Sequence, residues 1–207
     1  MPNWVYNKVY FHGKEEKINE LRDFVKGKEH VFDFNKIIPR PEELNLVSGS
    51  DETIARSCAV ARAEGKTTSE EFEKPWSSGR TFEEWADLGD KYLSNIKKYG
   101  ASTWYDWCWD NWGTKWNSSD AYWEDSKCVS FNTAWNAPTP IFKKLSELFP
   151  DVTFTVEYAD EDVGSNCGII KYDGKDFSEI EENTFEFACE VLGYDPDDFD
   201  RGDEYYE

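Results

Sequence analysis

The stretch from Lys127 to Tyr158, KCVSFNTAWNAPTPIFKKLSELFPDVTFTVEY, has the pattern of a strand, a helix and a second strand. Its first nine residues alternate, with Val129, Phe131 and Thr133 on one face of an extended segment. Two prolines then open a helix whose apolar residues recur at helical spacing. Residues 152–158 alternate again as a strand. We therefore predict a β-α-β unit here.

A second unit with the same order of elements lies at the N-terminus. Residues 4–11 are rich in β-branched and aromatic side chains, residues 15–26 have helical spacing, and residues 30–34 alternate as a short strand. Two such units predict an α+β fold, the ferredoxin-like split β-α-β sandwich, with an antiparallel sheet and helices on one face. Residues 168–172 are expected to add a strand, paired as a hairpin with the strand before it.

The two units are separated by a long helical segment. Residues 51–64 have a helical pattern, residues 66–79 are polar and typical of a loop, and a capping box at Thr81–Glu84 starts a helix that Gly100 ends. We predict a single domain over residues 1–174, carrying a Trp-rich helical insertion at about 36–126. An acidic C-terminal helix and tail are expected to follow, at residues 175–207, with the helix over residues 179–192.

The stretch Thr103–Asn117, TWYDWCWDNWGTKWN, holds five of the ten tryptophans. Helical spacing predicts a short helix that ends at Gly113, is buried around most of its circumference and carries Asn111 as a buried polar tie. One interpretation is a core plug between the insertion and the sheet. The other is an aromatic pocket that stacks a ring. The candidate ligand-binding residues are Trp104, Trp107, Asn111, Trp112, Lys115, Trp116, Asn117 and Asn132.

Four segments also resemble a known family. They are PNWVYNKV at residues 2–9, FDFNKIIPRPEEL at 32–44, WYDWCWDNWGTKWN at 104–117, and residues 131–158. Together they resemble phage- and plasmid-borne proteins of unknown function that carry a YubB-type ferredoxin-like domain. The resemblance implies a ferredoxin-like fold and a mobile genetic element as the source. It implies no catalytic residues.

The formal charge of −20 is distributed unevenly. Residues 175–207 hold thirteen Asp and Glu against one Lys and one Arg, a net charge of −11. Such a chain repels nucleic acid and favours a partner with a basic surface, although an acidic surface also serves ordinary solubility. The candidate partner-binding residues are Asp195, Asp197, Asp198, Asp200, Asp203 and Glu204.

The motifs of several enzyme and metal-protein classes are absent from the sequence. The five cysteines are widely spaced with no C-x-x-C pair, so we expect buried, reduced thiols and assign no metal site. No nucleophile elbow, phosphate-binding loop or dinucleotide fingerprint occurs, so no catalytic residue and no cofactor are assigned. No apolar run reaches the length of a membrane span, and we expect a cytosolic protein with no membrane association.

These observations support two functional hypotheses and a weaker third. The first is a non-enzymatic phage- or plasmid-encoded accessory protein that binds and modulates a host protein in the host cytosol. In this hypothesis the acidic surface acts like a DNA mimic on a host defence or DNA-processing factor, without direct nucleic-acid binding. The second is a binding protein or sponge for a small nucleotide-like ligand, using the Trp-rich pocket. The third is an enzyme of unrecognised type, and the oligomeric state stays open.

Overall fold

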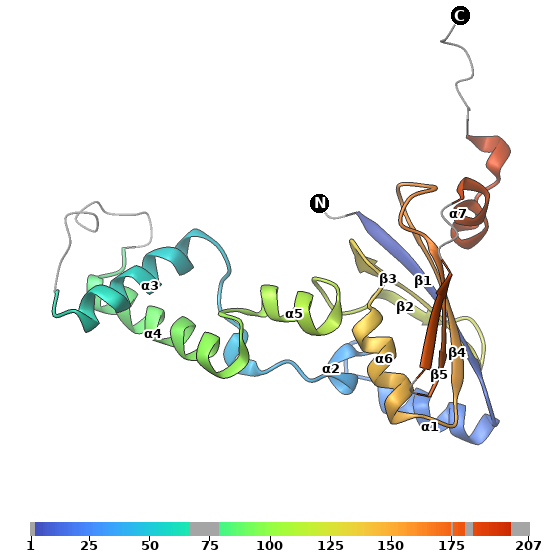
Figure 1. Cartoon of the computed structure of the whole chain (residues 1–207), viewed down its shortest axis with the longest axis horizontal. Helices are drawn as coiled ribbons and strands as arrows, with labels where there is room; N and C mark the ends of the chain where they lie inside the picture. Colours follow the sequence, from blue (N-terminus) through green and yellow to red (C-terminus); the bar gives the residue numbers. More distant parts are fainter. Residues whose placement is uncertain (1–2, 67–78, 175, 181–183, 200–207) are drawn as a thin grey trace, which may run out of the picture. The chain divides into compact units, whose positions relative to one another are not determined.

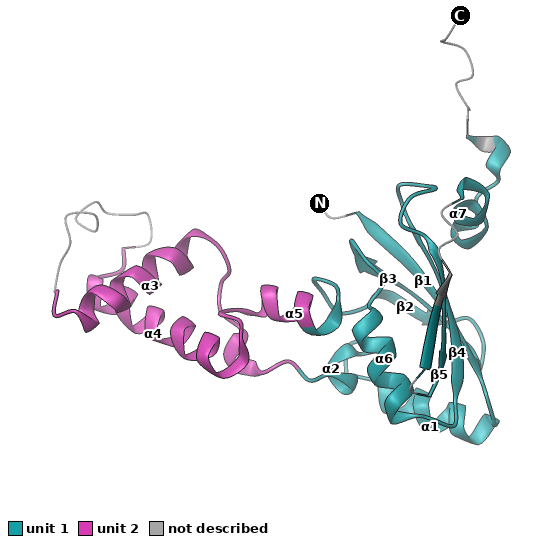
Figure 2. Cartoon of the chain, viewed as in Figure 1, with its two compact units in different colours: residues 1–39, 111–207 teal, residues 40–110 magenta. Residues whose placement is uncertain are grey.

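The computed structural model describes residues 3–66, 79–174, 176–180 and 184–199. The chain divides into two compact units (Figure 2). Unit 1 comprises residues 1–39 and 111–207, and unit 2 comprises residues 40–110. Unit 2 therefore falls inside the insertion predicted at 36–126, and residues 175–207 belong to unit 1.

The described residues of unit 1 form a six-stranded sheet, four α-helices and a 3-10 helix (Figure 1). Its elements in chain order are β1 (Trp4–His12), α1 (Glu15–Val25), α2 (Phe34–Ile37), β2 (Ser119–Trp123), β3 (Cys128–Ala134), α6 (Thr139–Leu148), β4 (Thr153–Asp160), β5 (Gly168–Asp173), β6 (Asp176–Ile180), α7 (Phe185–Leu192) and the 3-10 helix η2 (Pro196–Asp198).

The strands of unit 1 lie in the order β2-β3-β1-β4-β5-β6, and each neighbouring pair is antiparallel. Because β3 and β4 both run against β1, they are parallel to each other, and α6 connects them across the intervening strand. This is the split β-α-β arrangement of the ferredoxin-like fold. The unit predicted from residues 127–158 is confirmed, as is the β4–β5 hairpin.

The core of unit 1 lies between the sheet and the helices α1, α2 and α6, which cover one face (Figure 1). Alternate residues of β1 are buried, as its sequence pattern predicts. Phe142 of α6 lies with its ring 6.1–6.2 Å from Phe131 of β3 and Phe154 of β4. Stacking of Phe154 on Tyr172 of β5, at 4.9 Å, extends this aromatic core across the sheet.

The opposite face of the sheet is covered in part by α7. Ala188 and Val191 of α7 pack with Ala159 of β4 and Cys167, and Tyr6 of β1 lies against the same cluster. The C-terminal end of the described chain is attached to α7, because the Phe199 ring lies 5.1 Å from that of Phe185. Helices therefore lie on both faces, whereas the sequence predicts one covered face.

The strand predicted at residues 30–34 is wrong. The segment is irregular and then turns into α2, because the Asp33 side chain accepts a hydrogen bond from the Asn35 backbone N–H at 2.9 Å and so caps the helix. Phe32 and Phe34 are buried, so the alternation correctly marks core residues without forming a ladder. The place beside β3 is taken by β2, which the sequence did not predict.

The helix predicted over residues 179–192 begins later than expected. Residues 176–180 form the edge strand β6, and α7 starts after Thr184, whose hydroxyl accepts a hydrogen bond from the Phe187 N–H at 3.1 Å. Gly193 ends the helix in the left-handed conformation.

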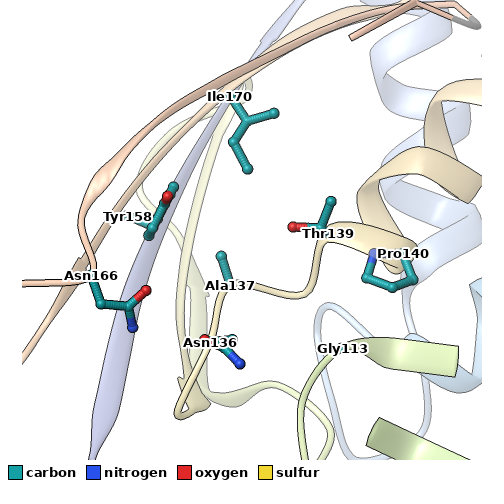
Figure 3. Close-up of a pocket in the computed structure, with 8 residues that line it drawn as sticks. All are labelled: Gly113, Asn136, Ala137, Thr139, Pro140, Tyr158, Asn166 and Ile170. Atoms are coloured by element: carbon teal, nitrogen blue, oxygen red, sulfur yellow. The ribbon is translucent and has the colours of Figure 1, made fainter. Parts of the chain in front are cut away.

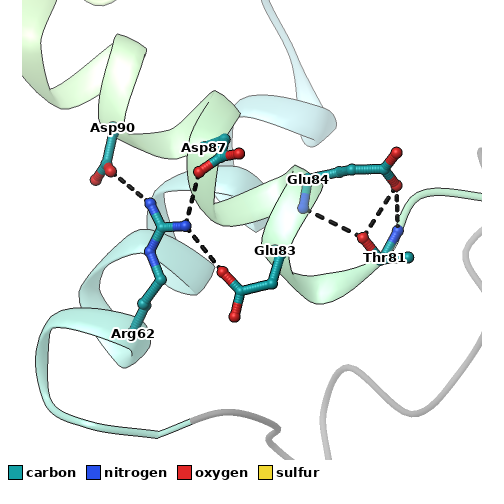
Figure 4. A network of polar contacts seen from close by, with 6 residues as sticks. All are labelled: Arg62, Thr81, Glu83, Glu84, Asp87 and Asp90. Atoms are coloured by element: carbon teal, nitrogen blue, oxygen red, sulfur yellow. Dashed lines mark hydrogen bonds and ion pairs between the residues drawn. The ribbon is translucent and has the colours of Figure 1, made fainter.

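Unit 2 is a pair of packed helices with a short lead-in. The elements are η1 (Glu42–Leu44), α3 (Ser50–Ala63) and α4 (Phe82–Tyr99). The predicted capping box is present, with reciprocal hydrogen bonds between Thr81 and Glu84 (Figure 4). Gly100 ends α4 as predicted. The loop predicted at residues 66–79 lies almost wholly outside the described residues.

Unit 2 is held by close helix packing and by polar contacts. Gly89 lies so near α3 that a Cβ atom there would come within 2.0 Å of the Ala55 carbonyl oxygen. The Arg62 guanidinium forms ion pairs with Glu83, Asp87 and Asp90 along α4 (Figure 4).

The Trp-rich stretch forms α5 (Trp104–Trp112), as predicted, and the boundary between the units passes through this helix. Trp107, Cys108 and Trp112 are buried, but Trp109 is 42% exposed, so burial covers less of the circumference than expected. Asn111 is only half-buried, which corrects its prediction as a buried polar tie.

Candidate functional site

A pocket of about 260 Å³ lies in unit 1 where β3 ends, α6 begins, and β4 and β5 meet (Figure 3). Its polar groups are two amides, a hydroxyl and a phenol, and the remaining walls are apolar. The lining residues are Gly113, Asn136, Ala137, Thr139, Pro140, Tyr158, Asn166 and Ile170. Convergent polar groups in an otherwise apolar concavity are the ordinary composition of a ligand site.

The turn after β3 forms one wall of this pocket. Trp135 has a φ of 69°, a left-handed conformation that is unusual for a bulky residue and is typically strained. Two hydrogen bonds hold it in place. Its backbone N–H donates to the Asn3 carbonyl at 2.9 Å, and its own carbonyl accepts from the Asn166 side-chain Nδ2 at 2.9 Å. Strain maintained by several partners is a feature of functional sites.

A buried carboxylate supports the opposite wall. Asp160 ends β4 and is 5% exposed. Its oxygens accept hydrogen bonds from the Asn3 amide at 3.3 Å, the Asn166 amide at 3.0 Å and the Asp162 backbone N–H at 2.9 Å. A buried charge of this kind requires such donors. Asp160 therefore fixes Asn166, whose φ of 47° is accessible to asparagine.

Three tryptophans and a lysine lie beside this turn. The Trp4 and Trp116 rings are 5.8 Å apart, and the Lys115 ammonium lies 4.4 Å from the Trp116 ring centroid and 5.2 Å from that of Trp135. Trp116 is 36% exposed. These distances fit cation–π contacts, which orient the lysine across two rings. We call Trp4, Lys115, Trp116 and Trp135 the tryptophan cluster.

A separate polar network occupies the face of the sheet that α7 covers only in part. The Lys8 ammonium pairs with Glu124 at 2.9 Å, and the Ser130 hydroxyl donates to the same carboxylate at 2.6 Å. Burial raises the pKa of Tyr6 to about 12 and that of the Cys128 thiol to about 12. The hydrogen bond to Glu124 raises the pKa of Lys8. Both tyrosine and thiol therefore stay protonated at neutral pH, which argues for a structural network.

The eight predicted ligand-binding residues do not meet at one place. Trp104 and Trp107 belong to unit 2, and the other six belong to unit 1. Trp112 is a core residue there, because its indole N–H donates to the Ile38 carbonyl at 2.9 Å. Lys115 and Trp116 lie in the tryptophan cluster.

Asn117 and Asn132 have different surroundings. The Asn117 Oδ1 accepts the Phe34 backbone N–H at 2.8 Å, and its Nδ2 donates to Asp33 at 2.7 Å, so Asn117 ties α2 to the chain before β2. Asn132 is half-buried on β3, opposite Tyr6. Gly113 is the residue of the Trp-rich stretch that belongs to the described lining of the pocket.

The predicted acidic site is described in part. Asp195 and Asp197 are exposed, and the Asp195 carboxylate accepts the Asp197 N–H at the start of η2. Asp198 belongs to η2, while Asp200, Asp203 and Glu204 lie outside the described residues.

Sequence reasoning missed the residues that line the pocket. Asn136, Thr139 and Asn166 lie in or next to turns, and their types are common in turns of any protein. Asp160 was visible only as one member of an acidic run. The available signal was position in the chain, because Asn136 follows the buried strand β3 and Thr139 begins the helix α6.

The structure defines unit 1 as a ferredoxin-like α+β domain with a pocket at one end of its sheet. Residues 111–201 match the family described as "Ferredoxin-like domain in Api92-like protein". This match agrees with the ferredoxin-like domain that the sequence resemblance implies.

A solved structure is also similar to the chain. It is the crystal structure of a protein Api92 from Yersinia pseudotuberculosis, 13% identical, with a TM-score of 0.43, covering 87% of this chain and 99% of that one. No curated protein matches the chain. Among the described helices, none has the length and apolar character needed to cross a membrane.

Proposed function

We propose that this chain is a non-enzymatic accessory protein, encoded by a phage or plasmid, that binds and modulates a host protein in the host cytosol. The binding surface would be the acidic half of unit 1, and the partner would present a basic surface. One observation carries the proposal. The negative charge is concentrated in the half of unit 1 that contains β4, β5, β6 and α7, and this half has few lysine and arginine residues.

The concentration of charge follows the order of the strands. Residues 150–207 hold nineteen Asp and Glu against three Lys and Arg, a net charge of −16, while residues 1–149 have a net charge of −4. The acidic segment supplies β4, β5 and β6, which are consecutive in the sheet, together with α7. Sheet topology therefore gathers on one half of unit 1 most of the charge that the sequence places in its last third.

The described carboxylates in the first part of this segment are also outside the ion pairs of the structure. Among the described residues, no acidic side chain from Asp151 through Asp176 forms an ion pair. Glu161, Asp173 and Asp176 are exposed. Unpaired like charges repel one another and weaken the folded state, so a basic partner would relieve this repulsion on binding.

Charge complementarity suggests the class of partner. A groove that normally binds nucleic acid carries clustered Lys and Arg, and its electrostatic attraction is independent of sequence. An acidic protein that occupies such a groove would act as a DNA mimic on a host defence or DNA-processing factor. The phage or plasmid source, implied by the resemblance, supports this class of target.

The test uses charge-neutralised variants of the full chain. Deleting residues 175–207 would also remove β6 and α7, and α7 contributes core residues, so truncation would confound charge with folding. One variant carries Glu161→Gln, Asp173→Asn and Asp176→Asn. A second neutralises the C-terminal acids Asp195, Asp197, Asp198, Asp200, Asp203 and Glu204. Partners captured from host lysate by each variant are compared with those of the unaltered protein.

The control removes the same charge from another surface, with Glu15→Gln, Glu16→Gln and Asp23→Asn on α1, all of which are exposed. We expect the first two variants to lose a specific partner and the control to retain it. Capture should also weaken steeply as salt concentration rises. Equal recovery by all variants, or recovery insensitive to salt, would sink the proposal.

The second candidate function is a small-ligand binding protein or sponge, and the tryptophan cluster is the observation that favours it. An exposed Trp116 ring held beside Lys115 could stack a nucleotide-like ring and pair with one negative charge. Tryptophan fluorescence titrated with a nucleotide panel tests this function. Trp116→Ala should abolish any quenching, and the exposed Trp109→Ala serves as the control. A panel without effect would eliminate this candidate.

A further inference from the structure

We propose that the pocket lined by Asn136, Thr139 and Asn166 binds a small neutral molecule that donates a hydrogen bond, such as an amide or a ring N–H. This site is distinct from the acidic half and from the tryptophan cluster. Its argument rests on the direction in which one side-chain amide is held.

The orientation of the Asn166 amide is determined by its two acceptors. The Nδ2 group donates to the Asp160 carboxylate at 3.0 Å and to the Trp135 carbonyl at 2.9 Å. Neither acceptor can donate in return, so the amide cannot be flipped without losing both bonds. Both Nδ2 hydrogens are used, and the Oδ1 atom has no hydrogen-bond partner among the described residues. Figure 3 shows Oδ1 on the Tyr158 side of the amide.

The pocket therefore presents a fixed acceptor and selects for a donor. A carboxylate ligand would place its oxygens against Oδ1, and a hydroxyl or N–H would be accepted instead. The Asn136 amide and the Thr139 hydroxyl, which also have no side-chain partner among the described residues, can complete the contacts from the opposite wall (Figure 3).

The charges around the pocket favour a neutral ligand. The described lining residues carry no charged side chain. Thr139 and Pro140 are the first two residues of α6, whose positive end disfavours a cation. Asp160 lies behind Asn166 and disfavours an anion. These opposing fields leave a neutral donor as the favoured ligand.

Size and wall chemistry limit the ligand further. A volume of about 260 Å³ is below the range of about 300–1,000 Å³ that holds drug-sized molecules. Ile170 and Ala137 supply apolar contact, and the Tyr158 ring is buried beside them. A single ring or a short amide therefore fits better than a nucleotide with its phosphates.

The experiment uses four related probes with the full-length protein. Benzamide carries the N–H donors, N,N-dimethylbenzamide lacks them, benzoate is anionic and benzylamine is cationic. Binding is followed by chemical-shift changes of the side-chain amides in NMR spectra. We expect benzamide to bind at least tenfold more tightly than each of the other three. N,N-dimethylbenzamide and benzoate lack the N–H donor, and the positive end of α6 disfavours the benzylammonium cation.

Variants then locate the site. Asn166→Gly keeps a residue that tolerates positive φ and removes the acceptor, and Thr139→Val removes only the hydroxyl. The matched control is Thr153→Val, at the other end of β4. Asn166→Gly should abolish benzamide binding, Thr139→Val should weaken it, and Thr153→Val should leave it unchanged.

The probe series on the unaltered protein stands even if Asn166→Gly fails to fold. Equal binding of benzamide and benzoate, binding unaffected by Asn166→Gly, or no binding of benzamide at solubility-limited concentration would each overturn the proposal. None of these outcomes affects the partner captured by the acidic half.

Discussion

The two units differ in whether their acidic residues form ion pairs. In unit 2, the carboxylates of α3 and α4 face cations, with Arg62 bonded to three of them and Arg56 paired with Glu52. In unit 1, none of the acidic residues from Asp151 through Asp176 forms a described ion pair, although Glu157 lies opposite Lys8 in the sheet. Both units carry net negative charge, so the difference lies in pairing.

The ion-paired carboxylates of unit 2 contribute to the stability of the fold, whereas the unpaired carboxylates of unit 1 do not. Exposed ion pairs contribute little individually, but a network on one helix face gives α4 a defined position against α3. Unpaired carboxylates contribute nothing of this kind and add repulsion. The unpaired carboxylates of the acidic half therefore give unit 1 no stabilisation of the kind that the Arg62 network gives unit 2.

The largest expected effect concerns the close packing of α3 against α4 in unit 2, which does not depend on ion pairs. Gly89→Ala would gain about 1 kcal/mol of helix propensity. The new Cβ would lie 2.0 Å from the Ala55 carbonyl oxygen, however, so the helices must separate. We expect a net loss of about 2 kcal/mol in the free energy of unfolding, seen in hydrogen exchange of α3 and α4 amides. Ser94→Ala, on the exposed side of α4, is the control and should cost almost nothing. Unchanged exchange in Gly89→Ala would contradict the close packing.

The sequence predicts elements well where local pattern and tertiary role agree. The unit at residues 127–158 combines alternation with a proline-started helix, and the capping box at Thr81 is a local signal. The strand predicted at residues 30–34 is wrong because the alternation indicates which side chains are buried and does not determine the backbone conformation. There the Asp33 side chain accepts the Asn35 N–H and starts a helix. The edge strand β2 was missed because none of the side chains in its sequence, SDAYW, is fully buried, so the strand has no apolar face to recognise.

The candidate site is less predictable because its members depend on contacts distant in sequence. Asn166 matters through Trp135, thirty-one residues earlier in the chain. Asp160 is distinguished from its acidic neighbours only by burial beneath Asn3, which a charge count cannot show. The helix predicted in the Trp-rich stretch is confirmed, and Gly113 is the residue of that stretch among the described lining of the pocket.

The second prediction removes the cation from the network of unit 2. Arg62→Met keeps most of the apolar stem and leaves Glu83, Asp87 and Asp90 facing one another. We expect a loss of stability that is larger at low salt than at high salt and larger than that of the single-pair variant below, measured by urea unfolding. Arg56→Met removes a single pair and should cost about 0.4 kcal/mol. A loss no greater than that of Arg56→Met would show that the network adds nothing.

The third prediction is that removing acidic charges from unit 1 increases the stability of the protein, the opposite of the effect expected in unit 2. Neutralising Glu161, Asp173 and Asp176 removes repulsion and breaks no described ion pair. Stability should therefore rise by about 0.3 kcal/mol at low salt and stay unchanged at high salt. The matched set in unit 2, Glu83→Gln, Asp87→Asn and Asp90→Asn, should lower stability instead. If both sets shift stability in the same direction, the contrast between the units fails.

The last prediction concerns the pH dependence of Glu124, a paired acid in the part of unit 1 formed by residues 1–39 and 111–149, where acidic and basic residues nearly balance. Burial raises the pKa of its carboxyl, but hydrogen bonds from Ser130 and Lys8 outweigh burial, so the pKa is lowered overall. A lowered folded-state pKa contributes stability above the ordinary value of 4.5, and that stability is lost as pH falls through the folded value.

Glu124→Gln should therefore cost less than about 1 kcal/mol at pH 7, and the cost should shrink at pH 3. Urea unfolding at both pH values measures it. Repeating the substitution in a Lys8→Met background isolates the pair, because the coupling between the two residues should vanish once Glu124 is protonated. An equal cost at both pH values would mean that Glu124 acts through its shape alone. In that case the Lys8–Glu124 pair would contribute no electrostatic stabilisation to unit 1.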